Sequence, residues 1–455
     1  MTIPRKLGVL AAAAALALAG CSTLQKVESL NILQGKKPPS ANARGNRIAI
    51  VALDEQLKVS DGLKGQDFYL PPPAPMADWP LPGGTPEQSV ENVDAGKDFV
   101  VAWKKPFGAG SSAIRHVTAP PIAAGGRIFV MDGAASVSAH DALTGAPIWR
   151  VNIEPKSKRD HEGFGGGIAF ADGKIYAASG FREVVQIDAA TGAIGWRVHT
   201  DAPLHSAPTV SGGRVFVVDV EDEMTSFVAA TGAQDWTYQA LAEPARILAA
   251  SSPAVSSDTV IGAFASGELV ALRATNGNEL WSASLSRASR TNALSEIRDI
   301  AGRPVIYKSD VYAVSHSNVM AATDLRTGTP RWSLPISATT TPWAAGDVVY
   351  VVDQSGKVIC ISRESGQIYW IHDLNAAAKG GKKPKKGVRI YWSSPILASN
   401  RLVTMSSKGD AVALDPKTGA LLKTLKLGER ALIGPMAAGG MIYVATDAAE
   451  LIAIR

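Results

Sequence analysis

One short motif recurs along this chain, and it constrains the fold more than any other feature. Each copy has a Thr-Gly, Ser-Gly or Asn-Gly pair, followed in all but the last copy by a tryptophan four residues after the glycine. The glycines of the copies are Gly145, Gly192, Gly232, Gly277, Gly328, Gly366 and Gly419. In the last copy Lys423 takes the place of the tryptophan. The period of roughly 40 to 50 residues is that of a four-stranded blade, so the repeats predict a β-propeller.

Each unit also shows the strands that a blade needs. In the third unit, runs rich in β-branched and aromatic residues cover 206–210, 214–218 and 225–229, and a fourth run carries Trp236. Glycine supplies the positive φ that a tight hairpin turn requires. A single blade cannot bury both faces, so we expect the repeated tryptophan to pack between neighbouring blades.

The two ends of the chain predict the number of blades. After the seventh unit, 436–440, 441–445 and 450–454 supply three strands and no fourth. Before the first unit, 98–103 is a lone strand that ends in the aromatic Trp103. Joined together, these strands make an eighth blade. We therefore predict an all-β, eight-bladed propeller of four-stranded antiparallel blades over 98–455, with seven blades as the alternative.

The N-terminus predicts export and lipidation. A basic pair at 5–6 precedes an apolar run at 7–19, which has the length of a signal peptide. A permanent membrane helix needs about 20 apolar residues, so this run is too short to be one. The run ends in Leu-Ala-Gly-Cys at 18–21, which resembles the bacterial lipobox. We expect residues 1–20 to be removed and Cys21 to be acylated, with a plain secretory signal as the alternative.

The segment between the lipidated cysteine and the propeller is proline-rich. It contains Pro71, Pro72 and Pro73, which favour extended structure and exclude helix. We interpret 21–97 as a tether that partly drapes on the propeller surface.

Cysteine content and charge exclude several classes of protein. Cys360 is the only cysteine besides Cys21, so neither a disulfide framework nor a zinc ribbon can form. Cys360 lies in an apolar, strand-like run and is predicted to be a buried thiol. A net charge of +5 over 455 residues is a weak bias and does not indicate nucleic-acid binding.

The repeat, with the consensus Asp-Ala-x-Thr-Gly-x-x-x-Trp, resembles the pyrroloquinoline-quinone-type propeller repeat. Quinone-dependent dehydrogenases, propellers fused to kinases and the BamB family of outer-membrane assembly lipoproteins share this repeat. The lipobox, the lone propeller and the Trp79-Pro80 and Gly83-Gly84 pairs together resemble the BamB family.

That resemblance implies a non-enzymatic scaffold of the outer-membrane β-barrel assembly machinery. The protein would be lipid-anchored in the outer membrane, face the periplasm, and bind the POTRA domains of BamA and other members of the complex. Unfolded outer-membrane proteins are further candidate partners. The implied contact residues are Arg246, Ile247, Leu248, Arg298, Asp299, Ile300 and Arg303. Ala249 and Ala301 depart from the family pattern, which has an arginine and an acidic residue there.

Two other functions stay open on the sequence. The first is a quinone-dependent dehydrogenase, although the adjacent cysteine pair and the Cys-x-x-Cys-His motif common in that class are absent. The second is a propeller that binds other envelope proteins.

No catalytic, metal or cofactor site is predicted. The glycine run at 163–167 lacks a strand-to-helix context, and we expect it to serve close packing at the propeller centre. The acidic run at 219–223 lacks the pattern of a calcium loop, and the histidines lack metal-ligand spacing. A lysine-rich insertion at 376–389 could meet anionic partners or could be a solvated loop.

Overall fold

The structure is a computed structural model, which describes residues 57–155, 163, 165–241, 251–286, 298–376 and 389–455. The described residues form 32 strands and no helix, and so none that could cross a membrane. The predicted signal peptide at 1–20 and Cys21 lie outside the described residues, and both stay predictions.

The strands form eight four-stranded sheets, which we number as blades 1 to 8. Blade 1 consists of β2 (Ile122–Ala124), β3 (Arg127–Met131), β4 (Ser136–Asp141) and β5 (Pro147–Asn152), and blade 2 of β6 (Gly166–Ala171), β7 (Lys174–Ser179), β8 (Glu183–Asp188) and β9 (Ile194–His199). Blade 3 consists of β10 (Thr209–Ser211), β11 (Arg214–Val218), β12 (Glu223–Val228) and β13 (Gln234–Gln239), and blade 4 of β14 (Ala254–Ser256), β15 (Thr259–Ala263), β16 (Glu268–Arg273) and β17 (Glu279–Ser284). Blade 5 consists of β18 (Val305–Tyr307), β19 (Asp310–Val314), β20 (Met320–Asp324) and β21 (Pro330–Leu334), and blade 6 of β22 (Trp343–Ala345), β23 (Val348–Val352), β24 (Lys357–Ser362) and β25 (Ile368–Asp373). Blade 7 consists of β26 (Ile396–Ala398), β27 (Arg401–Met405), β28 (Asp410–Leu414) and β29 (Leu421–Lys426), and blade 8 of β30 (Met436–Ala438), β31 (Met441–Ala445) and β32 (Glu450–Ile454) with β1 (Val101–Pro106).

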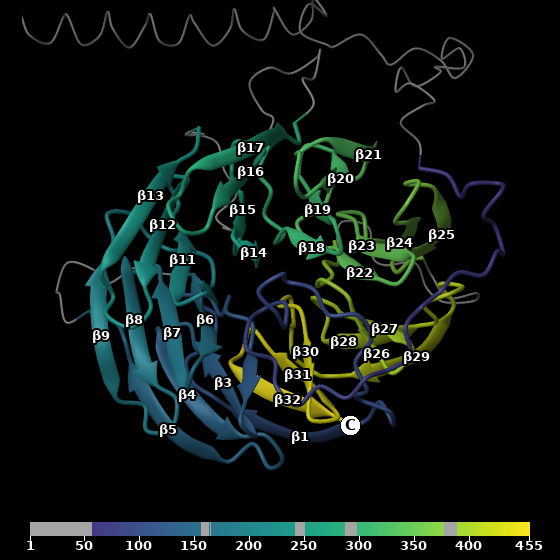
Figure 1. The fold of residues 1–455 in the computed structure, drawn as a ribbon. Coiled ribbons are helices and arrows are strands. Elements are labelled where there is room, and N and C mark those ends of the chain that lie inside the picture. The colour runs from purple at the N-terminus through teal and green to yellow at the C-terminus, as the bar shows by residue number, and fades with distance from the viewer. Residues whose placement is uncertain (1–56, 156–162, 164, 242–250, 287–297, 377–388) are drawn as a thin grey trace, which may run out of the picture. The chain divides into compact units, whose positions relative to one another are not determined.

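The blades surround a common centre, with the first strand of each repeat innermost (Figure 1). In blades 1 to 7, four consecutive strands pair antiparallel in chain order. Blade 8 has the order β1-β32-β31-β30, with Trp103 opposite Ala453 and Lys104 opposite Ile452. The prediction of eight blades closed by both ends of the chain is confirmed, and the seven-blade alternative is wrong.

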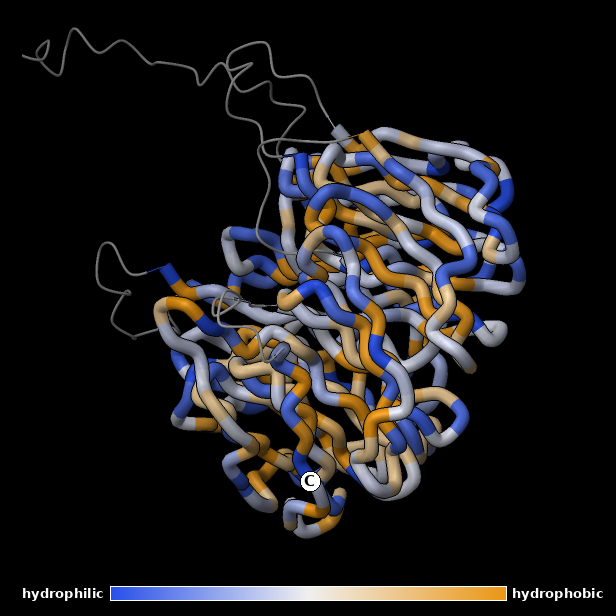
Figure 2. Tube along the Cα trace, turned by 90° about the vertical axis from the view of Figure 1, so that its left-hand side faces the viewer, coloured by the Kyte–Doolittle hydropathy of each residue, from blue (hydrophilic) through white to orange (hydrophobic). Residues whose placement is uncertain are grey.

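The hydrophobic core lies between neighbouring blades. Ile122 of blade 1 and Ile168 of blade 2 belong to one apolar cluster, and Val305 of blade 5 and Val349 of blade 6 belong to another. Hydrophobic residues concentrate along the strands, and hydrophilic residues gather at the turns (Figure 2). Each blade thus buries its faces mainly against its neighbours, with strap residues such as Trp79 and Leu81 adding to these clusters.

The repeated glycine and tryptophan join one blade to the next. The indole Nε1 of Trp149 donates to Ala189 O of the next blade at 3.0 Å, and a side chain at Gly192 would collide with the same indole at 2.9 Å. Five further tryptophans donate in the same way to the following blade: Trp196, Trp236, Trp281, Trp332 and Trp370. Where the tryptophan is lost, Lys423 Nζ donates to Asp98 O at 2.9 Å and links blade 7 to the N-terminal strand.

The described part of the predicted tether, 57–97, packs against the propeller, and we call it the strap. Its segment across the centre of the ring (Figure 1) pairs with the free inner edges of the inner strands. Trp79 exchanges backbone hydrogen bonds of 2.7 and 2.8 Å with Ala123 of blade 1, for example. The other backbone bonds to inner strands are Phe170 N to Pro80 O, Val255 N to Pro86 O, Ile306 N to Glu87 O and Val93 N to Leu397 O. The strap thereby pairs strand edges that would otherwise be open. The boundary at residue 97 stays a prediction.

The strap reaches the remaining blades through side chains and turns. Gln88 Nε2 donates to Thr209 Oγ1 of blade 3 at 3.2 Å, and Trp343 Nε1 of blade 6 donates to Glu91 O at 2.9 Å. Gly96 N donates to Gly440 O of blade 8 at 2.9 Å. The strap therefore contacts all eight blades.

Candidate functional site

The predicted contact residues belong to connections on one face of the propeller. All inner strands run in the same direction, so the segments that lead into them end at the same face, which we call the connection face. The segment at 298–303 leads into β18 of blade 5. Arg246, Ile247 and Leu248 belong to the connection into β14, but they lie outside the described residues.

Within 298–303 the side chains differ sharply in exposure. Arg298 is exposed, whereas Asp299 is 2% exposed and Ile300 is 1% exposed. Ile300 belongs to the apolar cluster between blades 4 and 5, and its amide donates to Phe264 O at 3.3 Å. His316 N donates to Asp299 O at 2.9 Å. The buried side chains of Asp299 and Ile300 therefore hold this segment against the fold. A direct contact of either residue with a partner stays a prediction.

The end of the segment is tied to its neighbouring blades. A Cβ at Gly302 would lie 2.5 Å from Thr340 O, so this close approach requires glycine. Ser251 Oγ of blade 4 donates to Gly302 O at 3.2 Å, and Arg303 N donates to Thr341 Oγ1 of blade 6 at 3.2 Å. These bonds fix the backbone of Arg303, which is half-buried.

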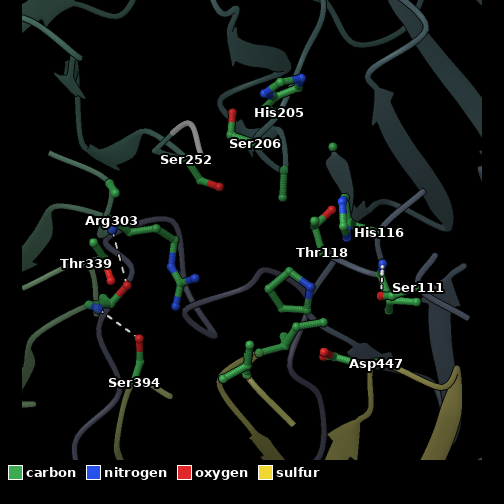
Figure 3. A pocket seen from close by; sticks show the side chains of 18 of the residues that line it. Ser111, His116, Thr118, His205, Ser206, Ser252, Arg303, Thr339, Ser394 and Asp447 are labelled. Carbon is green, nitrogen blue, oxygen red and sulfur yellow. Dashed lines mark hydrogen bonds between the residues drawn. The ribbon is translucent and has the colours of Figure 1, made fainter. Parts of the chain in front are cut away.

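A cavity of about 650 Å³ occupies the centre of the connection face. Serine and threonine hydroxyls make up much of its wall, together with His116, His205, Arg303, Arg430 and Asp447 (Figure 3). Arg303 Nη2 donates to Pro82 O of the strap at 3.4 Å, so the strap lies at the inner end of the cavity. We call this cavity the central well.

Asp447, the one carboxylate among the described residues of the central well, has a cationic partner. Arg430 Nε lies 3.3 Å from Asp447 Oδ2. Burial raises the pKa of Asp447, while the charges of Arg430 and His116 act in the opposite direction. An ionised Asp447 is thus neutralised locally by Arg430.

The sequence did not predict the central well. His116 and His205 had no ligand spacing, yet the fold brings both to its wall from connections in different blades. One sequence feature could have indicated the central well. Several inner strands begin after a proline that follows a polar residue, such as Ser252 before Pro253 and Ser394 before Pro395.

The glycine run has the packing role that was expected. A Cβ at Gly166 would lie 2.1 Å from Ala178 O, and one at Gly167 would lie 2.6 Å from the Ala207 side chain. Cys360 is a free, fully buried thiol, as predicted, and burial raises its pKa.

The acidic run forms a turn rather than a metal site. Asp219 Oδ1 accepts the amides of Glu221 at 2.8 Å and Glu223 at 3.0 Å. Among the described residues, no group of three or more His, Cys, Asp or Glu is placed to hold a metal ion. The lysines of the insertion at 376–389 lie outside the part of the chain that the structure describes, and only its two end residues, Ala376 and Arg389, are seen, both exposed.

Comparison with protein families gives one match. The family described as "Outer membrane protein assembly factor BamB" matches residues 133–372 and 378–455. Among curated proteins of that name, the one from Burkholderia pseudomallei is 24% identical over 352 residues, covering 77% of this chain and 86% of its own length. The one from Moranella endobia is 25% identical over 249 residues, covering 55% of this chain and 61% of the relative, less than two thirds of its length.

Solved structures show the same fold. The crystal structure of BamB from Moraxella catarrhalis aligns with a TM-score of 0.64 and 18% identity, over 77% of this chain and 99% of that one. A quinohemoprotein alcohol dehydrogenase from Pseudomonas putida HK5 aligns with a TM-score of 0.66 and 14% identity, over 83% and 80%. At these identities the structural likeness establishes the propeller and says nothing about chemistry.

Proposed function

This chain belongs to the BamB family of outer membrane protein assembly factors, and from that premise we propose that it is a non-enzymatic scaffold in the assembly of outer-membrane β-barrels. The observation that carries the proposal is the family match over 133–372 and 378–455, which covers most of the propeller. The eight-bladed ring supports it, because a rigid ring of loops is a suitable platform for binding other proteins.

The partner that we propose is BamA, bound through its periplasmic POTRA domains, within the barrel assembly complex. The contact would lie on the connection face, at 246–248 and at 298–303. Of the described residues in these segments, Arg298 is exposed and Arg303 is half-buried, so these two arginines are the side chains most able to reach a partner. Arginine is common at the energetic centres of protein interfaces.

We further propose that acylation of Cys21 holds the protein at the outer membrane, with the propeller in the periplasm. Each buried methylene of an acyl chain contributes about 0.8 kcal/mol, so two or more chains can anchor a domain whose described residues form no membrane-spanning helix.

The test is a pull-down of the full-length lipoprotein from detergent-solubilised envelopes, with mass spectrometry of the co-purified proteins. Arg298→Glu reverses an exposed charge on the connection face and should reduce recovery of BamA several-fold, because a reversed charge in an interface costs affinity. Arg326→Glu makes the same change at an exposed turn of blade 5 and should leave recovery unchanged. Asp299→Arg is a poorer probe, because a cation in that buried position would destabilise the fold.

The outcomes separate the role from the site. If Arg298→Glu leaves the recovery of BamA unchanged, the assembly role is still supported, and the contact with BamA lies at another part of the surface. Recovery of other envelope proteins without BamA would contradict the proposed partner and favour a propeller with a different partner.

A further inference from the structure

The position of Arg303 is unusual when the blades are compared. In seven blades a proline directly precedes the inner strand, and the residue before that proline occupies the same place in each blade. In blade 5 it is Arg303. In the other six blades it is small, a hydroxyl residue or a second proline: Pro120, Ala207, Ser252, Thr341, Ser394 and Gly434. Five of these six line the central well together with Arg303. One blade therefore points a guanidinium into a ring of otherwise small side chains.

Arg303 has no carboxylate partner among the described residues. Its Nε is buried without a hydrogen-bond partner, and its Nη2 makes only the 3.4 Å bond to Pro82 O. Four arginines between the blades pair with an acid: Arg150 with Asp132, Arg197 with Glu183, and Arg331 and Arg363 with Asp310. Burial lowers the pKa of Arg303 to about 10, which still leaves it charged at neutral pH. A cation withdrawn from water is costly unless it is paired, and no counterion for Arg303 lies among the described residues.

The surroundings of Arg303 suit an anion. Among the described residues on the wall of the central well the only carboxylate is that of Asp447, which already pairs with Arg430. The remaining polar groups are hydroxyls, which can donate to an oxyanion, and the imidazoles of His116 and His205. Figure 3 shows the Arg303 side chain extending into the cavity, with these groups around it.

We propose that the central well is a binding site for a small oxyanion, a carboxylate or a phosphate group, held by the guanidinium of Arg303. The planar fork of an arginine binds both groups in a bidentate manner. The volume of about 650 Å³ lies within the range of small-molecule sites. Arg303 also belongs to the segment proposed to contact BamA, so the two sites adjoin, but anion binding can be measured on the protein alone.

The experiment uses the full-length protein, purified in detergent and dialysed into a buffer without phosphate or carboxylates. Potassium phosphate and potassium citrate are titrated separately by calorimetry, and thermal unfolding is followed at constant ionic strength. Each anion that binds should give a saturable heat and a saturable rise in Tm, since a ligand that binds only the native state stabilises it. Arg303→Leu should weaken binding by about tenfold to a hundredfold, as expected for the loss of hydrogen bonds to a charged group.

Three further measurements keep the result interpretable. Arg326→Gln removes one charge at an exposed turn outside the central well and should bind like the parent protein. In the absence of anions, Arg303→Leu should unfold at a higher temperature than the parent, because it removes an unpaired buried charge. Arg303→Lys keeps the charge and loses the fork, so it should bind with intermediate affinity.

Saturable binding of citrate alone assigns a carboxylate ligand, and binding of phosphate alone assigns a phosphate. The proposal is overturned if neither anion binds, or if Arg303→Leu binds as the parent does. An increase in Tm that never saturates and is equal in all variants reflects general salt stabilisation and also overturns it. Because BamA takes no part in the measurement, failure here leaves the assembly role untouched.

Discussion

Asp219 shows how one side chain can make stability depend on pH. Burial raises its pKa to about 6, although its carboxylate accepts two backbone amides. A carboxyl whose folded-state pKa lies above its unfolded value favours folding below pH about 4, and that contribution is lost as the pH rises through 6. Asp219→Asn keeps an acceptor oxygen and removes the charge. It should therefore stabilise the protein by about 1 to 2 kcal/mol at pH 8, with the difference vanishing near pH 4.

Thermal unfolding of both proteins from pH 4 to pH 8 checks this prediction. Asp201→Asn, at an exposed position, is the matched control and should show no such pH-dependent difference. A stabilisation by Asp219→Asn that is the same at pH 4 and pH 8 would show that ionisation of Asp219 is not the cause.

Residue-level roles at the connection face were the hardest to predict from the sequence. Asp299 and Ile300 stand beside charged residues and resemble part of a surface loop, yet both are buried beneath it. The sequence pattern could not show this, because their burial depends on packing between blades 4 and 5 rather than on neighbours in the chain. Arg303 was predicted as a contact residue, but its place on the wall of the central well is seen only in the three-dimensional structure.

At the level of elements, blade 8 is where the ring closes. The apolar residues Leu451, Ile452 and Ile454 of β32 are fully buried, and the strand pairs with β1 on one side and β31 on the other. Deletion of 450–455 would remove this burial and open two strand edges. At about 1.5 to 3 kcal/mol for each large side chain, the loss is about 5 to 9 kcal/mol, comparable to the total stability of many proteins.

The truncated protein should therefore lose its folded structure as a whole, with a large fall in Tm or no cooperative transition in circular dichroism. Arg455→Ala, which removes an exposed side chain and keeps the two backbone bonds to Val100, should change little. A truncated protein with an unchanged Tm, in which only blade 8 exchanges its amides faster, would show that the ring tolerates an open blade.

Blades were predictable from the sequence because their signals are local and repeated. The turn glycine and the tryptophan occur in one unit after another, and their contacts, such as Trp281 with Gly328, follow the same geometry at each junction. The strap was not predictable in the same way. It occurs once, its prolines indicate only an extended chain, and its partners are strand edges far apart in the sequence.

For the whole molecule, the strap and the ring depend on each other. The inner strands leave their inner edges open toward the centre, and the strap pairs with several of these edges. The strap in turn lies at the inner end of the central well, where Pro82 accepts a hydrogen bond from Arg303. The strap, which is not part of the repeats, therefore connects the inner strands and supports the connection face from the centre of the ring.

Trp79 is the residue through which this arrangement can be tested. It is 1% exposed and stacks on Trp343 of blade 6, with ring centroids 6.3 Å apart, while its backbone pairs with Ala123 of blade 1. Trp79→Ala should lower the free energy of unfolding by about 3 to 5 kcal/mol, the usual cost of removing a buried tryptophan. It should also speed hydrogen exchange at the strap-bonded amides of Val255 in blade 4 and Ile306 in blade 5.

Hydrogen exchange followed by mass spectrometry, with chemical denaturation beside it, measures both effects. Trp392→Ala is the matched control, because Trp392 is half-buried on the connection face and bonds to Asn375 rather than to the strap. If exchange in Trp79→Ala rose only at Ala123 and stayed unchanged at Val255 and Ile306, the strap would consist of independent contacts. Faster exchange at all of these amides would instead mean that the strap acts as one cooperative element, which couples blade 1 to blades 4 and 5, neither of which is its neighbour in the ring.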